Sequence, residues 1–308
     1  MKKELYVLTG FLGAGKTSLL LHLLEHISGK KTGIIQNEFG KISVDGERIR
    51  RGDITMTEIS RGSIFCSCLK LTFVQALAEM GQMDLDQVFV ESSGLADPSN
   101  MEEILNAVRV LAGDVYEFKG AICLIDAVNF PGQVETEETV RRQLTHCHMA
   151  VINKVDLISE EELAALTASI RERNPRCKLV TCVNGRVSTD FLSEDLLQLQ
   201  WAEAEECTNS VDNKPKTFSL ECAEPISMAA FRAFLEASLP DCYRIKGVFL
   251  LEEGWHQVDV VEKLVDLVPC SPQDISHLVF LSKIGPKMIR VADTAWKETV
   301  GKPMKLKN

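Results

Sequence analysis

The chain has 308 residues, 45% of them hydrophobic and 25% charged, with a formal net charge of −10. At roughly 150 residues per domain, this length predicts two domains, and the composition excludes intrinsic disorder as a main theme. No run of eighteen apolar residues is present, so no membrane span is expected. Residues 1–210 carry 31 acidic and 21 basic side chains and therefore hold the whole negative excess. This disfavours non-specific nucleic-acid binding, which needs a basic surface.

The ten cysteines are scattered along the chain without the spacing of a secreted disulfide framework. The first apolar run is interrupted by glycines from Gly10 and by Lys16, which does not fit an export signal. We therefore expect a cytoplasmic protein whose cysteines are mostly reduced and buried. Only the close pair Cys66 and Cys68 departs from this scatter.

Short apolar runs alternate with helical patterns over the first two thirds of the chain. A strand at 5–8 leads into a glycine-rich turn and a helix at 17–27, which Gly29 closes. Further strands are expected at 32–36, 87–90, 121–125, 149–152 and 178–182, and further helices at 73–80 and 161–171. This alternation predicts an α/β fold, in which helices cover both faces of a mostly parallel sheet.

The pattern changes after a polar, acidic stretch that ends at Pro215. Beyond it, strands are expected at 217–221, 243–251, 255–260 and 278–281, and helices at 228–239 and 286–299. We therefore predict a first domain over 1–205, an acidic linker over 206–216 and a small α+β domain over 217–308. The lysine-rich tail at 302–307 is expected to be solvated and frayed.

The segment Gly10–Thr17 fits the pattern G-x-x-x-x-G-K-[ST] between an expected strand and an expected helix, the context of a phosphate loop. Glycines let backbone N–H groups surround phosphate oxygens, and the helix N-terminus adds partial positive charge. Lys16 is expected to reach the β- and γ-phosphates, and the Thr17 hydroxyl to ligate Mg²⁺. The nucleotide-binding residues expected in this loop are Gly13, Ala14, Gly15, Lys16, Thr17 and Ser18.

The segment Asn153–Asp156 fits N-K-x-D directly after an apolar strand. A carboxylate at Asp156 can accept two N–H bonds from guanine, and adenine lacks that donor pair. Asn153, Lys154 and Asp156 are therefore the expected guanine-binding residues, and the nucleotide is expected to be GTP or GDP. The pattern argues against a small-molecule kinase that binds adenine nucleotides.

Two acids are candidates for the metal side of the phosphates. Glu91 ends an apolar strand and fits a contact to water on Mg²⁺, and Gly94 can donate its N–H to the γ-phosphate. Such a contact would order a switch loop only when triphosphate is bound. Asp45 lies in a loop-like region and is a candidate to ligate Mg²⁺ or orient the attacking water. With Lys16, these two acids form the expected catalytic set, and a solvated strand end and a plain loop acid are the alternatives.

With these pieces assembled, the chain resembles the CobW family of P-loop GTPases, relatives of the nickel chaperones that serve urease and hydrogenase. The matching segments are 9–17, 37–40 with Asp45, 91–98 and 153–156, and segments 244–247 and 278–281 resemble the family's C-terminal domain. The resemblance implies GTP hydrolysis coupled to handling a transition metal (Zn²⁺, Co²⁺ or Ni²⁺) or to assembling a metalloenzyme or cobalamin enzyme. It implies a client metalloenzyme or corrinoid protein as partner.

The chain departs from the family in the cysteine motif between the switch regions. The family carries G-C-x-C-C, whose thiolates bind Zn²⁺ or a similar ion, and here Ser63 and Phe65 replace two of the cysteines. Cys66 remains, Cys68 is additional, and Glu38 is a candidate third ligand. Because tetrahedral Zn²⁺ takes four ligands, ordinary reduced thiols and a strained, redox-labile pair stay open as alternatives. A GTP-gated regulatory protein without metal cargo is the alternative function.

Two histidine pairs also resemble metal ligands. His22 and His26 lie four residues apart on the first helix and share one face, and we interpret them as a surface pair. His146 and His148 lead into the strand at 149–152 and would share one face of it. For these two we expect a structural role.

Overall fold

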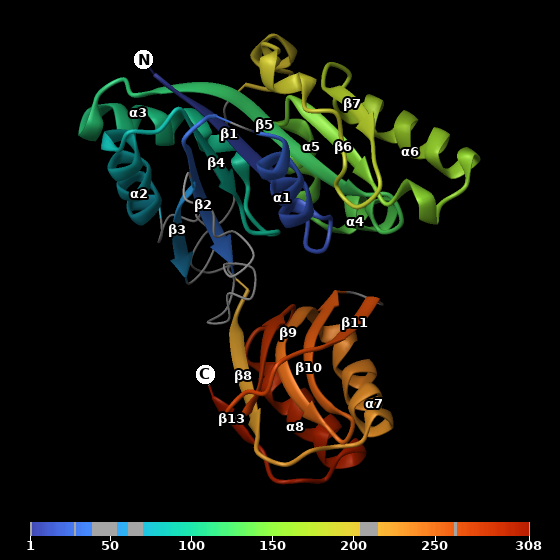
Figure 1. Ribbon diagram of the computed structural model, residues 1–308. Coiled ribbons are helices and arrows are strands. Elements are labelled where there is room, and N and C mark those ends of the chain that lie inside the picture. The colour runs from blue at the N-terminus through green and yellow to red at the C-terminus, as the bar shows by residue number, and fades with distance from the viewer. Residues whose placement is uncertain are drawn as a thin grey trace. The chain divides into compact units, whose positions relative to one another are not determined.

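The computed structural model describes residues 2–27, 29–38, 54–60, 70–203, 215–261 and 264–307, with the backbone alone at 37, 38, 56–60 and 70. The chain divides into two compact units, Met1–Asn213 and Lys214–Asn308 (Figure 1), and the division falls within the acidic stretch. The candidate site residues Asp45, Cys66 and Cys68 lie outside the described residues, and so does the side chain of Glu38.

The first unit is built on a seven-stranded sheet of order β3-β2-β4-β1-β5-β6-β7. Its strands are β1 (Lys3–Gly10), β2 (Thr32–Glu38), β3 (Ile54–Ser60), β4 (Gln87–Glu91), β5 (Tyr116–Asp126), β6 (Met149–Asn153) and β7 (Lys178–Thr181). Every pair of neighbouring strands runs parallel. The α/β class predicted from the alternating pattern is confirmed.

Helices follow the strands and pack on both faces of the sheet (Figure 1). They are α1 (Lys16–His26), α2 (Lys70–Gln82), α3 (Met101–Ala112), α4 (Phe130–Thr136), α5 (Glu138–Thr145) and α6 (Glu160–Arg173). Short 3₁₀ turns occur at η2 (Pro98–Asn100), η3 (Val155–Leu157), η4 (Asp190–Ser193) and η5 (Leu196–Leu199). No helix in the described part of the chain is both long and apolar enough to cross a membrane.

The central strand β1 serves two hydrophobic cores at once, because successive side chains of a strand point to opposite faces. Leu5 and Val7 are fully buried in a core formed with α2 and α3. Tyr6 and Leu8 are buried in the opposite core, formed with α1 and the segment around η4 and η5. A strand with this burial pattern lies in the middle of the sheet, which places the loop that follows it at the centre of the sheet's carboxyl edge.

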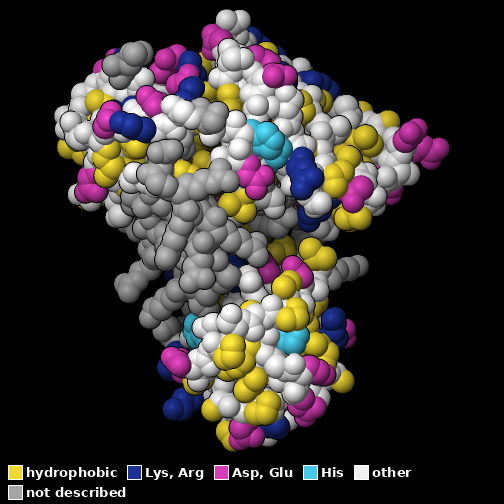
Figure 2. Space-filling view, viewed as in Figure 1, with side chains coloured by type: hydrophobic (Ala, Val, Ile, Leu, Met, Phe, Trp, Pro, Cys, Tyr) yellow, Lys and Arg dark blue, Asp and Glu magenta, His cyan; other side chains and the backbone are white. Residues whose placement is uncertain are grey.

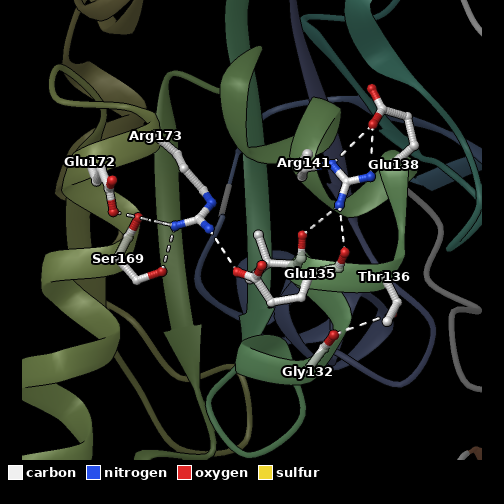
Figure 3. Close-up of polar contacts among 9 residues, drawn as sticks. Gly132, Glu135, Thr136, Glu138, Arg141, Ser169, Glu172 and Arg173 are labelled. Carbon is white, nitrogen blue, oxygen red and sulfur yellow. Dashed lines mark hydrogen bonds and ion pairs between the residues drawn. The ribbon is translucent and has the colours of Figure 1, made fainter.

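Two arginines join α4, α5 and α6 (Figure 3). Arg141 on α5 donates to the backbone carbonyls of Val134 and Glu135 at 2.8 and 3.0 Å, near the end of α4. Arg173 on α6 donates to the carboxylate of Glu135 at 2.9 Å. Carbonyls at the end of a helix have no intrahelical partner, so Arg141 satisfies groups that α4 cannot satisfy itself.

The second unit is an antiparallel sheet of order β11-β10-β9-β12-β8-β13 with two helices. Its elements are β8 (Thr217–Cys222), α7 (Met228–Ser238), η6 (Leu239–Asp241), β9 (Cys242–Leu251), β10 (Gly254–Val261), β11 (Leu264–Pro269), β12 (Ser276–Ser282), α8 (Lys287–Thr299) and β13 (Lys305–Lys307). The core between sheet and helices is aromatic. The ring of Phe234 meets Trp296 and Phe280 edge to face, at centroid distances of 5.0 and 6.0 Å.

The lysine-rich tail forms a strand, so the expectation of a frayed tail was wrong. β13 pairs antiparallel with β8, and the indole N–H of Trp296 donates to the carbonyl of Lys302 at 2.7 Å. Leu306 packs against the aromatic core while its two lysine neighbours are exposed. The strand pattern here consists of one apolar residue between two lysines. A pattern this short cannot be distinguished by sequence from a solvated tail.

The docked tail makes the second unit's stability depend on Leu306. Replacing Leu306 by Ala removes half-buried apolar surface, and we expect it to lower the free energy of unfolding by about 1–2 kcal/mol. The matched control Lys305→Ala, at an exposed neighbour, should change it by less than about 0.5 kcal/mol. Urea unfolding followed by tryptophan fluorescence measures both, and equal effects of the two variants would mean that the tail is not docked.

Candidate functional site

The loop between β1 and α1 adopts a conformation that requires glycine at both of its ends. Gly10 has φ of 130°, and a Cβ there would lie 2.3 Å from the carbonyl oxygen of Leu124 on β5. Gly15 has φ of 103°, and a Cβ there would lie 2.3 Å from Nδ2 of Asn153. Both glycines are needed for close approach as well as for their dihedral angles, which explains their places in the phosphate-loop pattern.

The ammonium of Lys16 is held by the backbone of the loop. Its Nζ donates to the carbonyls of Gly10 and Phe11 at 2.8 and 3.0 Å, and the residue is 8% exposed. The neighbouring Gly13 and Ser18 are exposed, whereas Ala14 is buried. The loop therefore has a defined conformation, in which the ammonium of Lys16 is hydrogen-bonded to two carbonyls of the loop itself.

Thr17 and Glu91 form the corner beside the loop. The Thr17 hydroxyl donates to Oε1 of Glu91 at 2.5 Å, and Nε2 of Gln36 donates to Oε2 of the same carboxylate at 2.9 Å. Glu91 is only 5% exposed, so both of its oxygens are oriented by neighbours from α1 and β2. Gln36 was not among the predicted site residues, although a polar residue inside the apolar strand at 32–36 is a usable signal.

The segment after Glu91 is buried along its whole length and is anchored to α5. Residues 91–100 are all buried. The carboxylate of Asp97, fully buried, accepts from Nε of Arg142 at 2.7 Å and from the N–H of Ser99 at 3.0 Å. The amide of Gln143 donates to the carbonyls of Gly94 and Ala96 at 3.1 and 2.8 Å. Side chains of α5 therefore hold the candidate switch segment, residues 91–100, through an ion pair and hydrogen bonds.

Gly94 itself touches the phosphate loop. A Cβ at Gly94 would lie 2.6 Å from the backbone nitrogen of Leu12, so the two loops approach each other more closely than any side chain permits. Gly94 therefore lies beside the loop that is predicted to bind phosphates. It remains a prediction that its N–H reaches the γ-phosphate.

Asn153 joins the phosphate loop to the segment after β7. Its Nδ2 donates to the carbonyl of Ala14 at 2.9 Å, and its Oδ1 accepts from the N–H of Gly185 at 3.1 Å. Burial raises the pKa of the Cys182 thiol to about 11, so this thiol stays protonated and donates to the same Oδ1 at 3.3 Å. Asn153 is 2% exposed, and its amide is used inside the protein.

Lys154 and Asp156 occupy different environments. Lys154 has φ of 66°, a left-handed backbone conformation, and its Nζ donates to Oδ2 of Asp126 at 2.6 Å. Asp126, at the end of β5, also accepts from the N–H groups of Val128 and Asn129 at 3.0 and 3.2 Å. Asp156 lies in η3 and is exposed, and within the described residues its carboxylate has no hydrogen bond or ion pair. Asp126 was not among the predicted site residues, although it is an acid that ends an apolar strand, which is the signal that identified Glu91.

His148, which precedes β6, has the structural role expected from the sequence, but neither it nor His146 lies in a strand. α5 ends at Thr145, His146 is its C-cap, and β6 begins at Met149. Nδ1 of His148 accepts from the N–H of Ala121 at 3.0 Å, and burial lowers the pKa of His148 to about 4. The described cysteines are buried, except for the half-exposed Cys270, which confirms the expectation of buried free thiols for this part of the chain.

The geometry brings most of the candidate site residues to the carboxyl ends of neighbouring parallel strands, where ligands bind in open α/β sheets. A glycine-rich loop between a buried strand and a helix, a lysine and a threonine that open the helix, and an acid from the adjacent strand define a P-loop nucleotide-binding protein. Residues 4–181 match the family described as CobW/HypB/UreG, nucleotide-binding domain, and residues 216–291 match the cobalamin synthesis protein cobW C-terminal domain. The chain belongs to the CobW/HypB/UreG family.

The chain is similar to several named proteins. The zinc-regulated GTPase metalloprotein activator 1 of Schizosaccharomyces pombe is 27% identical over 92% of this chain and 81% of that protein. The zinc chaperone YjiA of Escherichia coli is 31% identical, over 60% of this chain and 59% of that protein. Among solved structures, Zn(II)-bound YjiA GTPase from E. coli has 21% identity and a TM-score of 0.47, over 97% of this chain and 99% of that one. The predicted family, and with it the predicted class of CobW-type P-loop GTPases, is confirmed.

The buried ion pair between Asp97 and Arg142 predicts that replacing Arg142 destabilises the protein more than replacing the exposed Arg109. Arg142→Ala leaves the carboxylate of Asp97 buried without its charged partner, and we expect a loss of about 3–5 kcal/mol in stability. The control Arg109→Ala removes an exposed arginine that pairs with Asp114 and should cost less than about 1 kcal/mol. Thermal unfolding measures both. Comparable losses in the two variants would show that Arg142 does not anchor the segment.

Proposed function

We propose that the protein is a Mg²⁺-dependent GTPase that acts as a metallochaperone or metalloenzyme-assembly factor. The observation that carries the proposal is the joined site, in which Thr17 and Glu91 meet beside the phosphate loop and Asn153 ties that loop to the base side. The chain's membership in the CobW/HypB/UreG family and relatives named zinc chaperones support the metal-handling part.

The corner of Thr17 and Glu91 fits Mg²⁺. A hydroxyl and a carboxylate are the hard oxygen donors that Mg²⁺ takes, and such sites use few protein ligands together with phosphate oxygens. When bound, Mg²⁺ supplies neutralisation of the phosphate charge. The chain's own residues perform the positioning: Gln36 orients Glu91, and Lys16 exchanges two loop carbonyls for phosphate oxygens. That exchange is favourable because the charged oxygens of a phosphate are stronger acceptors than neutral carbonyls.

Guanine selection rests on Asp156. The amide of Asn153 is used between two loops and the ammonium of Lys154 is paired with Asp126, so these two residues position the site. Asp156 is exposed and its carboxylate is available to accept N1–H and N2–H of guanine. We therefore assign base recognition to Asp156 and loop positioning to Asn153 and Lys154.

Metal cargo is assigned to the segment between the switch regions. Glu38, Cys66 and Cys68 are the proposed transition-metal ligands, and Asp45 is the proposed second acid at Mg²⁺ or the attacking water. In this mechanism GTP closes the loops around the cargo, and hydrolysis releases it to a client metalloenzyme or corrinoid protein. Residues 91–100 are held on α5 by the contacts of Arg142 and Gln143. A conformational change on GTP hydrolysis can therefore pass from this segment to α5.

A second function, a GTP-gated regulator without metal cargo, is favoured by one observation. Ser63 and Phe65 stand where the family carries cysteines, so two of its three thiolates are absent. Such a protein would keep the nucleotide site described above and would regulate a corrinoid or other enzyme by its conformation alone.

The base assignment predicts a change of specificity in Asp156→Asn. The variant should lose at least about 100-fold in GTP affinity, because two charge-assisted hydrogen bonds are removed. It should gain affinity for xanthosine triphosphate, whose C2 carbonyl accepts from the new amide. Fluorescent-nucleotide titration measures both, with Glu161→Gln in the exposed first turn of α6 as the control. Unchanged GTP affinity in Asp156→Asn contradicts the guanine assignment.

The cargo assignment predicts nucleotide-dependent metal binding. Zn²⁺ and Co²⁺ should bind with micromolar or tighter affinity in the presence of a GTP analogue and more weakly with GDP. Bound Co²⁺ should show thiolate charge-transfer absorption that Cys66→Ser/Cys68→Ser abolishes. The same absorption and affinity in both nucleotide states would exclude gated carriage. No thiolate-bound metal in either state would favour the regulator.

A further inference from the structure

A second group of metal-ligating side chains lies away from the phosphate loop. Among the described residues, His22, Glu25 and His26 are the one set of three or more such residues whose ligand atoms all lie within 4.8 Å of one another. They occupy the C-terminal turn of α1, the helix that begins with Lys16 and Thr17. In Figure 2, histidine reaches the surface of the first unit beside an acidic side chain.

Helical spacing brings the three ligands onto one face. Residues three and four apart are neighbours on a helix surface, and the rings of His22 and His26 are 4.3 Å apart between centroids. His22 is half-buried, and Glu25 and His26 are exposed. The exposed side chain of Glu25 can therefore adjust its rotamer, while His22 is held in place.

Each histidine has one ring nitrogen facing a backbone carbonyl. Nε2 of His22 lies 2.8 Å from the carbonyl oxygen of Val187, and Nδ1 of His26 lies 2.8 Å from that of His22. Because a carbonyl only accepts, these nitrogens carry the protons. The opposite nitrogens, Nδ1 of His22 and Nε2 of His26, then present lone pairs. Metal-binding histidines typically donate their second N–H in this way, which orients the ring and raises its basicity.

The position at the end of the helix adds an electrostatic preference. The last carbonyls of an α-helix have no intrahelical partner and give its C-terminus a partial negative charge. A cation at the last turn of α1 is therefore favoured, whereas the anionic phosphates belong at its first turn.

We propose that His22, Glu25 and His26 form a binding site for a borderline divalent metal ion, with Zn²⁺ as the first candidate. Two imidazoles and one carboxylate supply three of the four positions of a tetrahedral site and leave the fourth to water. Bonds of about 2.0–2.2 Å bring the ligand atoms closer together than the 4.8 Å within which they lie here, and a rotamer change of the exposed Glu25 with small movements of the two rings provides that. The site uses no residue of the proposed nucleotide or cargo sites, so it does not depend on the proposed function.

The test separates this site from the cysteines by using the full chain with Cys66→Ser/Cys68→Ser as the parent. The parent should bind one equivalent of Zn²⁺ in the absence of nucleotide, measured by competition with a chromophoric chelator. Adding His26→Gln should weaken that binding by at least about tenfold, since even loss of an outer-shell partner costs 10–100-fold, and adding Glu25→Gln should weaken it less. Bound Co²⁺ should show visible ligand-field bands without thiolate charge transfer.

The matched control is His277→Gln in the second unit, which should leave Zn²⁺ affinity unchanged. His26 and Glu25 are exposed, so both variants should keep the parent's thermal unfolding profile. If the parent binds no Zn²⁺, or if His26→Gln binds it as tightly as the parent, the two histidines are an ordinary surface pair and the proposal is wrong. Failure of thiolate-dependent binding in the intact chain would instead bear on the cargo assignment.

Discussion

The buried amide of Asn153 is the contact on which the rest of the site depends. It accepts from the segment after β7 and donates to the phosphate loop, and it approaches Gly15 so closely that no side chain fits there. A single planar amide therefore sets the spacing between the predicted phosphate and base subsites. An aspartate at this position could not donate to the carbonyl of Ala14, and an aliphatic residue would leave two buried loop groups without partners. The phosphate loop and the segment after β7 are consequently linked through this one side chain.

The carboxylates of two other residues follow the same principle, because each is held by a partner from a distant part of the chain. Glu91 is oriented by Gln36 from a neighbouring strand, and Asp97 is paired with Arg142 on a helix. A parallel sheet allows such pairing, because the carboxyl ends of its strands lie at one edge and bring segments that are far apart in sequence side by side. Carboxylates held in this way are already oriented in the absence of a ligand. The burial of residues 91–100 extends that preorganisation to the candidate switch.

The sequence predicts most of the fold and the local motifs but not the supporting contacts. The phosphate loop and the N-K-x-D segment can be read directly because their chemistry lies within a few residues. Gln36 and Asp126 carry local signals, as polar residues within or at the end of apolar strands. Their partners, like that of Arg142, could not be assigned in this way, because these contacts arise only when separate strands or helices meet. The edge strands β3, β11 and β13 were missed for a related reason. An edge strand is half-exposed, so its apolar signal is weak, and β13 contains only one apolar residue. Local sequence therefore indicates the candidate groups for chemistry, whereas tertiary packing determines which residues hold them.

The helix α1 illustrates how one element can serve two charges of opposite sign. Its first residues, Lys16 and Thr17, lie where backbone N–H groups and the helix dipole favour anions. Its last turn carries two imidazoles and a carboxylate where unpaired carbonyls favour cations. His22 also contacts the carbonyl of Val187, two residues beyond Gly185, which bonds to Asn153. The C-terminal turn of α1 is thus joined by short covalent and hydrogen-bonded steps to the amide that spaces the nucleotide loops.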